Sequence, residues 1–331
     1  MTDKSHIDWT DATWNPVTGC TKVSAGCKNC YAEREWPRLA ANPKAAKYYG
    51  REFTDVRCHE EVLDQPLRWQ KPRRIFVNSM SDLFHENVPD YFIGAVFNTM
   101  YDAKRHQFQL LTKRPDRMCN FMLGTTGCGA NYDPIPNIWY GVSVEDQKAA
   151  DERIPSLLLI PAVVHWVSME PLLGPVHLTH VDYGAPAPYH LDALVGYCEN
   201  GTDTNLDWVV VGGESGPKAR PMHPDWVRAL RDQCITAGVP FFFKQWGEWL
   251  PISPVYSNDI DPQEFIDEWD DGKRELLAMD FSGFIWNHWK GDKDIEFNGQ
   301  PATSSWYFAK VGKQRAGREL DGQIWDQYPE V

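Results

Sequence analysis

The stretch Trp208-Val-Val-Val-Gly212 is almost wholly apolar, ends in glycine and is followed shortly by the polar residues Glu214 and Ser215. A short run of this kind is typical of a strand buried on both faces, as in a parallel sheet covered by helices. Comparable runs recur at residues 75–79, 108–112, 138–142, 163–168 and 240–244. With a further short strand expected before Cys20, the sequence predicts about seven strands.

Helical stretches are expected between these strands, at residues 88–104, 146–159 and 224–237. The last of them begins with Pro224 and is followed by Gly238, and these residue types are common at the start of a helix and just past its end. Strands that alternate with helices favour an α/β fold, here a partial or complete parallel (β/α) barrel of the TIM type. We assign this barrel to residues 1–250.

Three regions interrupt the repeating pattern. Insertions are predicted near residues 119–136 and 173–205. The first segment is interrupted by glycines and prolines, and the second is too long for a simple connection between a strand and a helix. The pattern stops after Glu248, so residues 251–331 are expected to form a small C-terminal extension that packs on the barrel. Its predicted anchors are Trp286, Trp289 and Trp306.

The composition narrows the classes of partner. The chain of 331 residues carries a formal net charge of -13, which argues against a broad basic surface for duplex nucleic acid. No apolar run approaches the roughly 20 residues that span a bilayer, and the N-terminus lacks the apolar core of a signal peptide. We therefore expect a cytoplasmic protein with no membrane partner.

Three cysteines lie close together in Thr18-Gly-Cys-Thr-Lys-Val-Ser-Ala-Gly-Cys-Lys-Asn-Cys-Tyr31. Thiolates are strong ligands for soft metals, and three of them leave one coordination position of a metal or cluster open for substrate. Cys20, Cys27 and Cys30 are therefore the candidate metal ligands and the expected chemical centre. Cys30 is predicted to open a helix, whose dipole favours thiolate over thiol. The remaining cysteines are interpreted as reduced thiols: Cys58, Cys119, Cys128, Cys198 and Cys234.

A structural zinc ion is the alternative interpretation of this cluster. Cys27 and Cys30 have the two-residue gap of a zinc knuckle, and a distant residue such as His59 or Cys58 would supply the fourth ligand. In that case the protein is expected to be a non-enzymatic module that binds nucleic acid or another protein.

Polar residues recur where the predicted strands end. In β/α barrels the chemistry is found at the carboxyl ends of the strands, so these residues are candidates for one shared site. About half of them are expected merely to end strands and bind water. The residues are Asn78, Ser79, Ser81 and Asp82, then Lys113 and Arg114, Ser143 and Glu145, Ser168 and Glu170, Gly213, Glu214 and Ser215, and finally Lys244 and Gln245.

Several segments together resemble a known family. They are Trp9-Thr-Asp-Ala-Thr-Trp-Asn-Pro-Val-Thr-Gly-Cys20, Cys27-Lys-Asn-Cys-Tyr-Ala-Glu33, Gly141-Val-Ser-Val-Glu145, Ser168-Met-Glu-Pro-Leu-Leu-Gly174, Val211-Gly-Gly-Glu-Ser-Gly216 and Phe242-Phe-Lys-Gln-Trp-Gly-Glu248. The chain resembles the phage-associated three-cysteine-motif family, whose activity is largely unassigned. That family is in turn similar to radical S-adenosylmethionine enzymes, although six residues separate Cys20 from Cys27 where three are usual.

The resemblance implies a barrel of the radical S-adenosylmethionine type with a [4Fe-4S] cluster on Cys20, Cys27 and Cys30. The open iron would be chelated by S-adenosylmethionine, and an electron from a donor such as a flavodoxin or ferredoxin would cleave it. The resulting deoxyadenosyl radical would abstract hydrogen from a substrate. The association with phages suggests a nucleotide or DNA base as substrate and the host cytoplasm as location.

The resemblance also implies roles for the strand-end residues. Acceptors for the amino group of S-adenosylmethionine are expected at Ser79, Ser81 and Asp82. Lys113 is expected to pair with its carboxylate, Ser143 or Glu145 to bind ribose, and the backbone of Gly212, Gly213, Glu214 and Ser215 to approach the adenine. Substrate binding or proton handling is left to Glu170, Lys244, Gln245 and Glu248. Basic groups at residues 71–74 and 113–117 would hold phosphate, or are ordinary solvated clusters.

Overall fold

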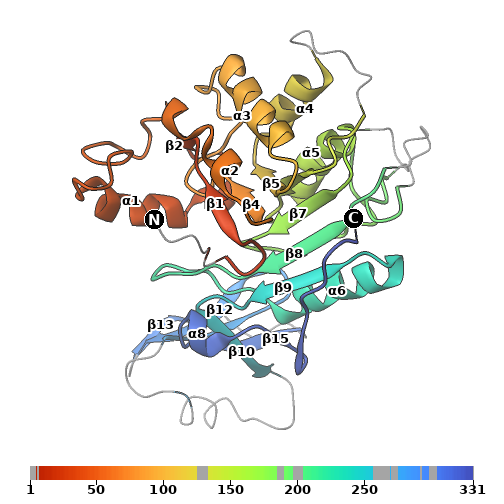
Figure 1. Ribbon diagram of the computed structural model, residues 1–331. Coiled ribbons are helices and arrows are strands. Elements are labelled where there is room, and N and C mark those ends of the chain that lie inside the picture. The colour runs from red at the N-terminus through yellow and green to blue at the C-terminus, as the bar shows by residue number, and fades with distance from the viewer. Residues whose placement is uncertain are drawn as a thin grey trace.

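A seven-stranded parallel sheet forms the centre of the protein. The computed structural model describes residues 5, 7–124, 133–184, 190–196, 204–255, 269, 275–290, 293–297 and 304–330. The strands follow one another across the sheet in sequence order, and each pairs in parallel with the next. They are β1 (Ala12–Trp14), β4 (Arg74–Val77), β5 (Gln107–Thr112), β6 (Ile138–Ser143), β7 (His165–Met169), β8 (Trp208–Gly212) and β9 (Phe241–Gln245). The sheet curls into a half-barrel, which confirms the predicted partial barrel (Figure 1).

Helices flank this sheet, and Figure 1 shows α3, α4 and α5 grouped on one side of it. The helices predicted at residues 88–104, 146–159 and 224–237 are confirmed as α3, α5 and α6. The helices and 3-10 turns are η1 (Ala25–Cys27), α1 (Tyr31–Ala40), η2 (Glu60–Val62), α2 (Gln65–Arg68), α3 (Asp90–Asp102), α4 (Pro115–Leu123), α5 (Gln147–Leu158), α6 (Pro224–Ala237) and α8 (Lys313–Ala316).

Helix α4 corrects the predicted limits of the first insertion. The insertion expected from residue 119 overlaps the last turns of this helix, which ends at Gly124 in a left-handed conformation. Residues 125–132 lie outside the described part of the chain, as do Cys128 and Cys198. Of the second expected insertion, the described residues Val181 and Leu191 form an antiparallel bridge and are buried.

Successive side chains along each strand point to opposite faces of the sheet, and the apolar ones form a core on each face. Ile75, Val209 and Phe241 point outward and pack in the core between the sheet and its helices. Their neighbours point inward and form an aromatic core on the concave face: Trp9, Phe76, Trp139, Val164, Trp166, Trp208, Val210 and Phe242. This inner core fills one end of the half-barrel and leaves the carboxyl ends of the strands for a site.

A five-stranded antiparallel sheet follows β9 and lies beside it and α6 (Figure 1). Its order is β10-β14-β11-β12-β13, and the sequence analysis did not predict it. The expected anchor Trp306 does contact the barrel, because its Nε1 donates to Asp225 of α6 at 3.3 Å and Arg228 lies over its ring. The side chains of Trp286 and Trp289 are outside the described ones. The strands are β10 (Trp249–Pro254), β11 (Glu275–Met279), β12 (Ile285–Lys290), β13 (Lys293–Phe297) and β14 (Trp306–Lys310).

The last residues of the chain return to the half-barrel along the free edge of β9. Phe243 N donates to Trp325 O at 2.9 Å, and Trp208 Nε1 donates to Gln327 O at 2.9 Å. Tyr328 packs on the inner aromatic core. The tail therefore satisfies backbone groups that an open sheet edge would expose. Two short pairs, β2 (Val17–Thr18) with β3 (Arg57–Cys58) and β15 (Glu319–Leu320) with β16 (Gln323–Ile324), complete the strands of the described residues.

In the part of the chain that the structure describes, none of the helices has both the length and the apolar character that crossing a membrane requires.

Candidate functional site

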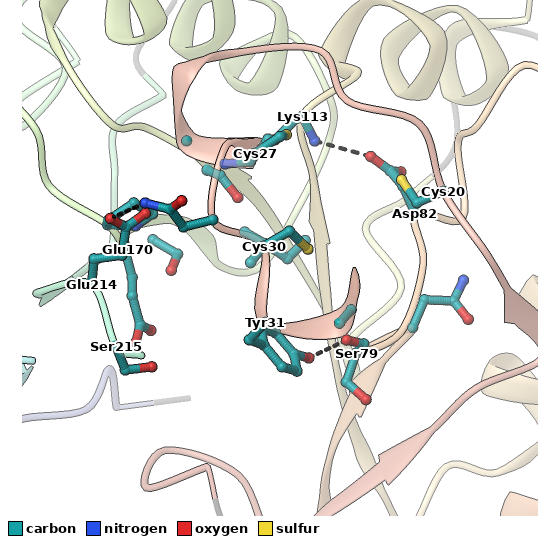
Figure 2. Close-up of a pocket in the computed structure, with 18 of the residues that line it drawn as sticks. Cys20, Cys27, Cys30, Tyr31, Ser79, Asp82, Lys113, Glu170, Glu214 and Ser215 are labelled. Carbon is teal, nitrogen blue, oxygen red and sulfur yellow. Dashed lines mark hydrogen bonds between the residues drawn. The ribbon is translucent and has the colours of Figure 1, made fainter. Parts of the chain in front are cut away.

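A cavity of about 420 Å³ opens at the carboxyl ends of the parallel strands. Most of the residues that the sequence analysis singled out line it: Cys20, Cys27, Cys30, Ser79, Ser81, Asp82, Lys113, Ser143, Glu170, Gly213, Glu214, Ser215, Lys244 and Gln245. Gly212, Glu145 and Glu248 are not among the lining residues. Figure 2 shows the three cysteines around this cavity, with Asp82 beside Cys20 and with Glu170 and Glu214 on the opposite side.

The cysteine loop connects β2 to α1. Gly19 has a φ of 89°, and the Asp55 and Phe53 carbonyls occupy the space where a side chain would begin, so only glycine fits there. Cys20 is fixed through its backbone, whose N–H donates to Phe53 O at 2.9 Å. The following residues form the turn η1, and Cys30 is the N-cap of α1, as predicted.

Burial favours the neutral thiol at Cys20 and Cys30, because it raises the pKa of each. Burial, and then the negative charge of Asp82, raise the pKa of Cys20 to about 12, although Arg114 acts in the opposite direction. Burial also raises the pKa of Cys30, and it outweighs the backbone amides of Ala32 and Glu33 that lower it. The start of the helix does favour thiolate at Cys30, as expected, but burial has the larger effect on its pKa. Binding of a metal would release protons from these groups.

Asp82 is the centre of a buried polar cluster beside Cys20. Its carboxylate accepts from Thr112 Oγ1 at 2.8 Å, from the backbone N–H of Lys113 at 3.2 Å and from Arg114 Nη1 at 3.1 Å. The same Arg114 nitrogen lies 3.8 Å from the sulfur of Cys20. Asp82 thus fixes a guanidinium group against the first cysteine, in addition to facing the cavity.

Ser79 and Ser81 stand at the end of β4, next to the cysteine loop. The Ser81 hydroxyl donates to Val17 O at 2.8 Å, and the Ser79 carbonyl accepts from the Tyr31 hydroxyl. Tyr31 follows the third cysteine and lines the cavity, so its ring connects the cysteine loop to β4 (Figure 2). Both serines line the same cavity as Cys30, and their hydroxyls are hydrogen-bonded to Asn15 and to Val17 O.

Glu145 lies beneath the cysteine loop. Its carboxylate accepts from Arg153 Nη1 at 2.9 Å and from Lys113 Nζ at 3.4 Å, and the residue is 2% exposed. Burial would raise the pKa of Glu145, but Lys113 and Arg153 lower it to about 2. Its expected role in binding ribose has no direct support here, because both oxygen atoms already face protein cations. Ser143, the other candidate, lines the cavity.

Glu214 lines the cavity and is also hydrogen-bonded to the cysteine loop. It accepts from Asn29 Nδ2 at 2.9 Å and from Arg220 Nη2 at 2.6 Å. The neighbouring glycines have structural explanations. A Cβ at Gly213 would lie 1.9 Å from Trp246 O, and one at Gly212 would lie 3.3 Å from Glu170 Cδ. The space that these glycines leave is therefore filled by the protein itself.

Glu170 and Lys244 form an ion pair on the cavity wall opposite Asp82. Lys244 Nζ lies 2.8 Å from each carboxylate oxygen of Glu170, and Gln245 Nε2 donates to Oε1 at 3.0 Å. These three expected substrate residues therefore act as one cluster. Glu248, the fourth, instead accepts from Gly216 N at 2.8 Å outside the cavity lining.

The two basic groups named in the sequence analysis have acidic partners. Arg74 pairs with Asp11 and lies over the ring of Tyr328. Arg114 pairs with Asp82, and Arg117 pairs with Asp90 at 3.0 Å. Arg114 and Arg117 follow β5 at the cavity end of the strands, whereas Arg74 begins β4 at the opposite end. Their acidic partners favour the interpretation as ordinary clusters over a role in holding phosphate.

The sequence analysis missed two side chains that matter to the site. Asn29 and Arg220 contact Glu214, but they come from opposite ends of the barrel sequence. The position of Asn29 between two cysteines was the only available signal. Arg114 was named as a strand-end residue, yet its contact with Cys20 was not foreseen.

The donors in the cavity fit a cluster that three thiols hold. All three cysteines face one space, and neither His59 nor Cys58, the proposed fourth zinc ligands, lines it. Both ring nitrogens of His59 have protein partners, Thr18 at 2.8 Å and Glu61 at 3.1 Å. Among the described residues, no group of three or more His, Cys, Asp or Glu side chains is close enough to share a single metal ion. In an iron–sulfur cluster, each of three thiolates would bind a separate iron.

Comparison with known proteins identifies a family whose function is not known. A family model described as "Protein of unknown function (DUF5131)" matches residues 4–329. A search of curated proteins and a search of solved structures each return no match.

Proposed function

This chain belongs to the DUF5131 family, and we propose that it is a radical S-adenosylmethionine enzyme whose cluster is held by Cys20, Cys27 and Cys30. One observation carries the proposal: three thiols from a single loop line one cavity at the carboxyl end of a parallel half-barrel. Chemistry in such folds is located at this end of the strands. Three protein ligands leave one iron of a [4Fe-4S] cluster open.

When bound, the reduced cluster would supply the electron that cleaves S-adenosylmethionine to a deoxyadenosyl radical. The chain's own residues bind and orient that molecule. Ser79 and Ser81, which line the cavity together with Cys30, would receive its ammonium group, and Lys113, which also pairs with Glu145, would hold its carboxylate. Ser143 and the backbone of the loop after Gly212 stand farther around the rim for the nucleoside part. The aromatic core below excludes water from the inner end of the site.

The proposal is tested by S-adenosylmethionine cleavage. Anaerobically reconstituted protein with dithionite is expected to release 5′-deoxyadenosine. Cys20→Ala, Cys27→Ala and Cys30→Ala should each reduce the rate to the background of free iron and sulfide. Cys58→Ser is the matched control, because Cys58 is a partly buried thiol outside the cavity lining and should leave the rate within about twofold. Wild-type protein that contains the cluster yet forms no deoxyadenosine would contradict the assignment.

A nucleotide or DNA base is the substrate class that we propose for the wall formed by Glu170, Lys244 and Gln245. Carboxylate, ammonium and amide groups side by side can pair with the donors and acceptors of a base edge. Flat aromatic rings, Trp9 and Phe76, line the same cavity.

Loss of the ammonium group should weaken binding of this substrate class. Lys244→Gln removes the partner of Glu170, so the affinity for single deoxynucleotides is expected to fall about tenfold, as for loss of one charge-assisted hydrogen bond. Lys104→Gln is the control, since Lys104 is exposed beyond α3 and lies over Tyr101. Binding is measured by calorimetry with each of the four deoxynucleotides. Equal affinity for an unrelated polyanion would remove nucleotides as the substrate class.

A further inference from the structure

The chain between Cys20 and Cys30 is held from two sides by buried carboxylates that belong to other parts of the barrel. Glu214 follows β8 and Glu145 follows β6. Each carboxylate accepts from at least two protein donors, and Glu214 also lines the cavity. Their contacts converge on the turn η1 and on the residue between the second and third cysteines.

Glu214 holds the loop through Asn29 and Arg220. The Asn29 amide donates to Glu214 Oε2 at 2.9 Å, and also to Lys218 O at 2.7 Å. Arg220 makes three hydrogen bonds to the same carboxylate, and its Nη2 donates to Ala25 O at 3.1 Å. One carboxylate therefore fixes residues on both sides of Cys27. Glu214 itself is 6% exposed, so the hydrogen bonds to its carboxylate count more than bonds on the surface, whereas the bonds to Lys218 O and Ala25 O are exposed.

Glu145 supports the loop from below at Gly26. A Cβ at Gly26 would lie 3.1 Å from Glu145 Cδ, so the missing side chain lets the turn rest directly on the carboxyl group. Arg153 and Lys113 keep that group in place. The extra length of the loop between Cys20 and Cys27 is thus accommodated by a turn with its own support.

Cys20 does not depend on these contacts. Its backbone N–H donates to Phe53 O, and the preceding Gly19 N–H donates to Met80 O at 3.3 Å. The first cysteine is consequently part of the β2 region, whereas Cys27 ends the supported turn η1 and Cys30 follows Asn29 as the N-cap of α1. Loss of the contacts of Glu214 and Glu145 should therefore change the exposure of Cys27 and Cys30 more than that of Cys20.

We propose that Glu214 and Glu145 are positioning residues for Cys27 and Cys30, and that the Asn29–Glu214 hydrogen bond orders this part of the loop before any metal binds. The inference rests on the proposed function for the purpose of the thiols, but not on the identity of the metal. A loop that is already ordered binds a cluster without first losing its conformational entropy.

The test measures alkylation of individual cysteines in the metal-free protein by iodoacetamide and mass spectrometry. Asn29→Ala removes the link and leaves the ion pair of Glu214 with Arg220 intact. Both thiols are partly exposed in the ordered loop, so we expect the rates at Cys27 and Cys30 to rise about fivefold as the loop opens further, and the rate at Cys20 to stay within about twofold.

Two further variants distinguish loss of the Asn29–Glu214 hydrogen bond from a general loosening of the cysteine loop. Asn29→Asp places a second carboxylate against Glu214, so its effect should exceed that of Asn29→Ala. The double variant Asn29→Asp with Glu214→Gln exchanges amide and carboxylate and is expected to restore rates toward those of the wild type. Asp321→Asn is the matched control, because it breaks a carboxylate–arginine contact with Arg228 outside the cavity.

Rates at Cys27 and Cys30 that stay within twofold in both single variants would overturn the inference. An equal rise at all three cysteines would also overturn it, because that pattern indicates general loosening. Failure of the proposed function gives a different result: the alkylation pattern changes as expected, but wild-type protein binds no iron on reconstitution.

Discussion

Gly213→Ala is expected to leave little folded protein, with a loss of stability of more than about 4 kcal/mol. A Cβ at this position would lie 1.9 Å from the carbonyl oxygen of Trp246. That oxygen is a backbone atom, so a change of side-chain rotamer cannot relieve the clash. The same stretch is bound from the other side, because Gly213 N donates to Gln245 O at 2.8 Å. The loops after β8 and β9 would have to separate, and the cavity would be disturbed because the first of these loops and the end of β9 line it.

Gly94→Ala is the matched control for this substitution. Gly94 lies within α3, and an added Cβ meets no atom within 4 Å. Alanine should therefore stabilise the protein by about 0.5–1 kcal/mol, through helix propensity alone. The comparison is made by urea denaturation followed by tryptophan fluorescence. Equal stability of the two variants would show that the contact between the loops after β8 and β9 is not as close as described.

Glu145→Gln is expected to cost about 3 kcal/mol near neutral pH, because it leaves the buried Arg153 without its ionic partner. The penalty should depend on pH in a defined direction. The folded pKa of Glu145 is about 2, below its ordinary 4.5, so its charge stabilises the fold above about pH 5. That contribution, also about 3 kcal/mol, is lost as the pH falls from 4.5 toward 2.

The measurement compares wild-type and Glu145→Gln protein by urea denaturation at pH 7, 4 and 3. The difference between them should shrink at each step toward acid. Glu152→Gln serves as the control, since Glu152 forms an exposed ion pair with Lys148 at 3.7 Å within α5. This substitution should cost under about 0.5 kcal/mol of stability at every pH. A difference that does not change with pH would contradict the ion pairing of Glu145.

The parallel half-barrel could be predicted from local pattern because buried parallel strands have a strong local signature. Runs such as Trp208–Gly212 are apolar on both faces, and the pattern changes where a helix begins. The position of the site followed from the same pattern, since parallel strands bring their carboxyl ends to one edge. The strand ends therefore identified most of the cavity lining before any contact was known.

The antiparallel sheet and the final tail could not be predicted in this way. Strands such as β10 and β12 contain polar and aromatic residues without a clear alternation, and tertiary pairing decides their conformation. The return of Gln327 to Trp208 joins residues far apart in the sequence. Nothing in the local composition of the tail indicates which edge it covers.

The roles of charged residues were the least predictable part of the site. Glu214 was expected near adenine because it stands in a glycine-rich turn, yet it is bound to Asn29 across 185 residues. Whether a strand-end carboxylate faces a ligand or a protein cation depends on such long-range partners. A single sequence does not record them.

The most direct test of the central claim is the metal content of anaerobically reconstituted protein. About four irons and about four sulfides per chain are expected, together with the broad visible absorbance of an iron–sulfur cluster. Cys30→Ala should lose most of both, whereas Cys58→Ser should keep them. Colourless protein that holds about one zinc per chain under the same conditions would contradict the assignment of the three cysteines to a cluster.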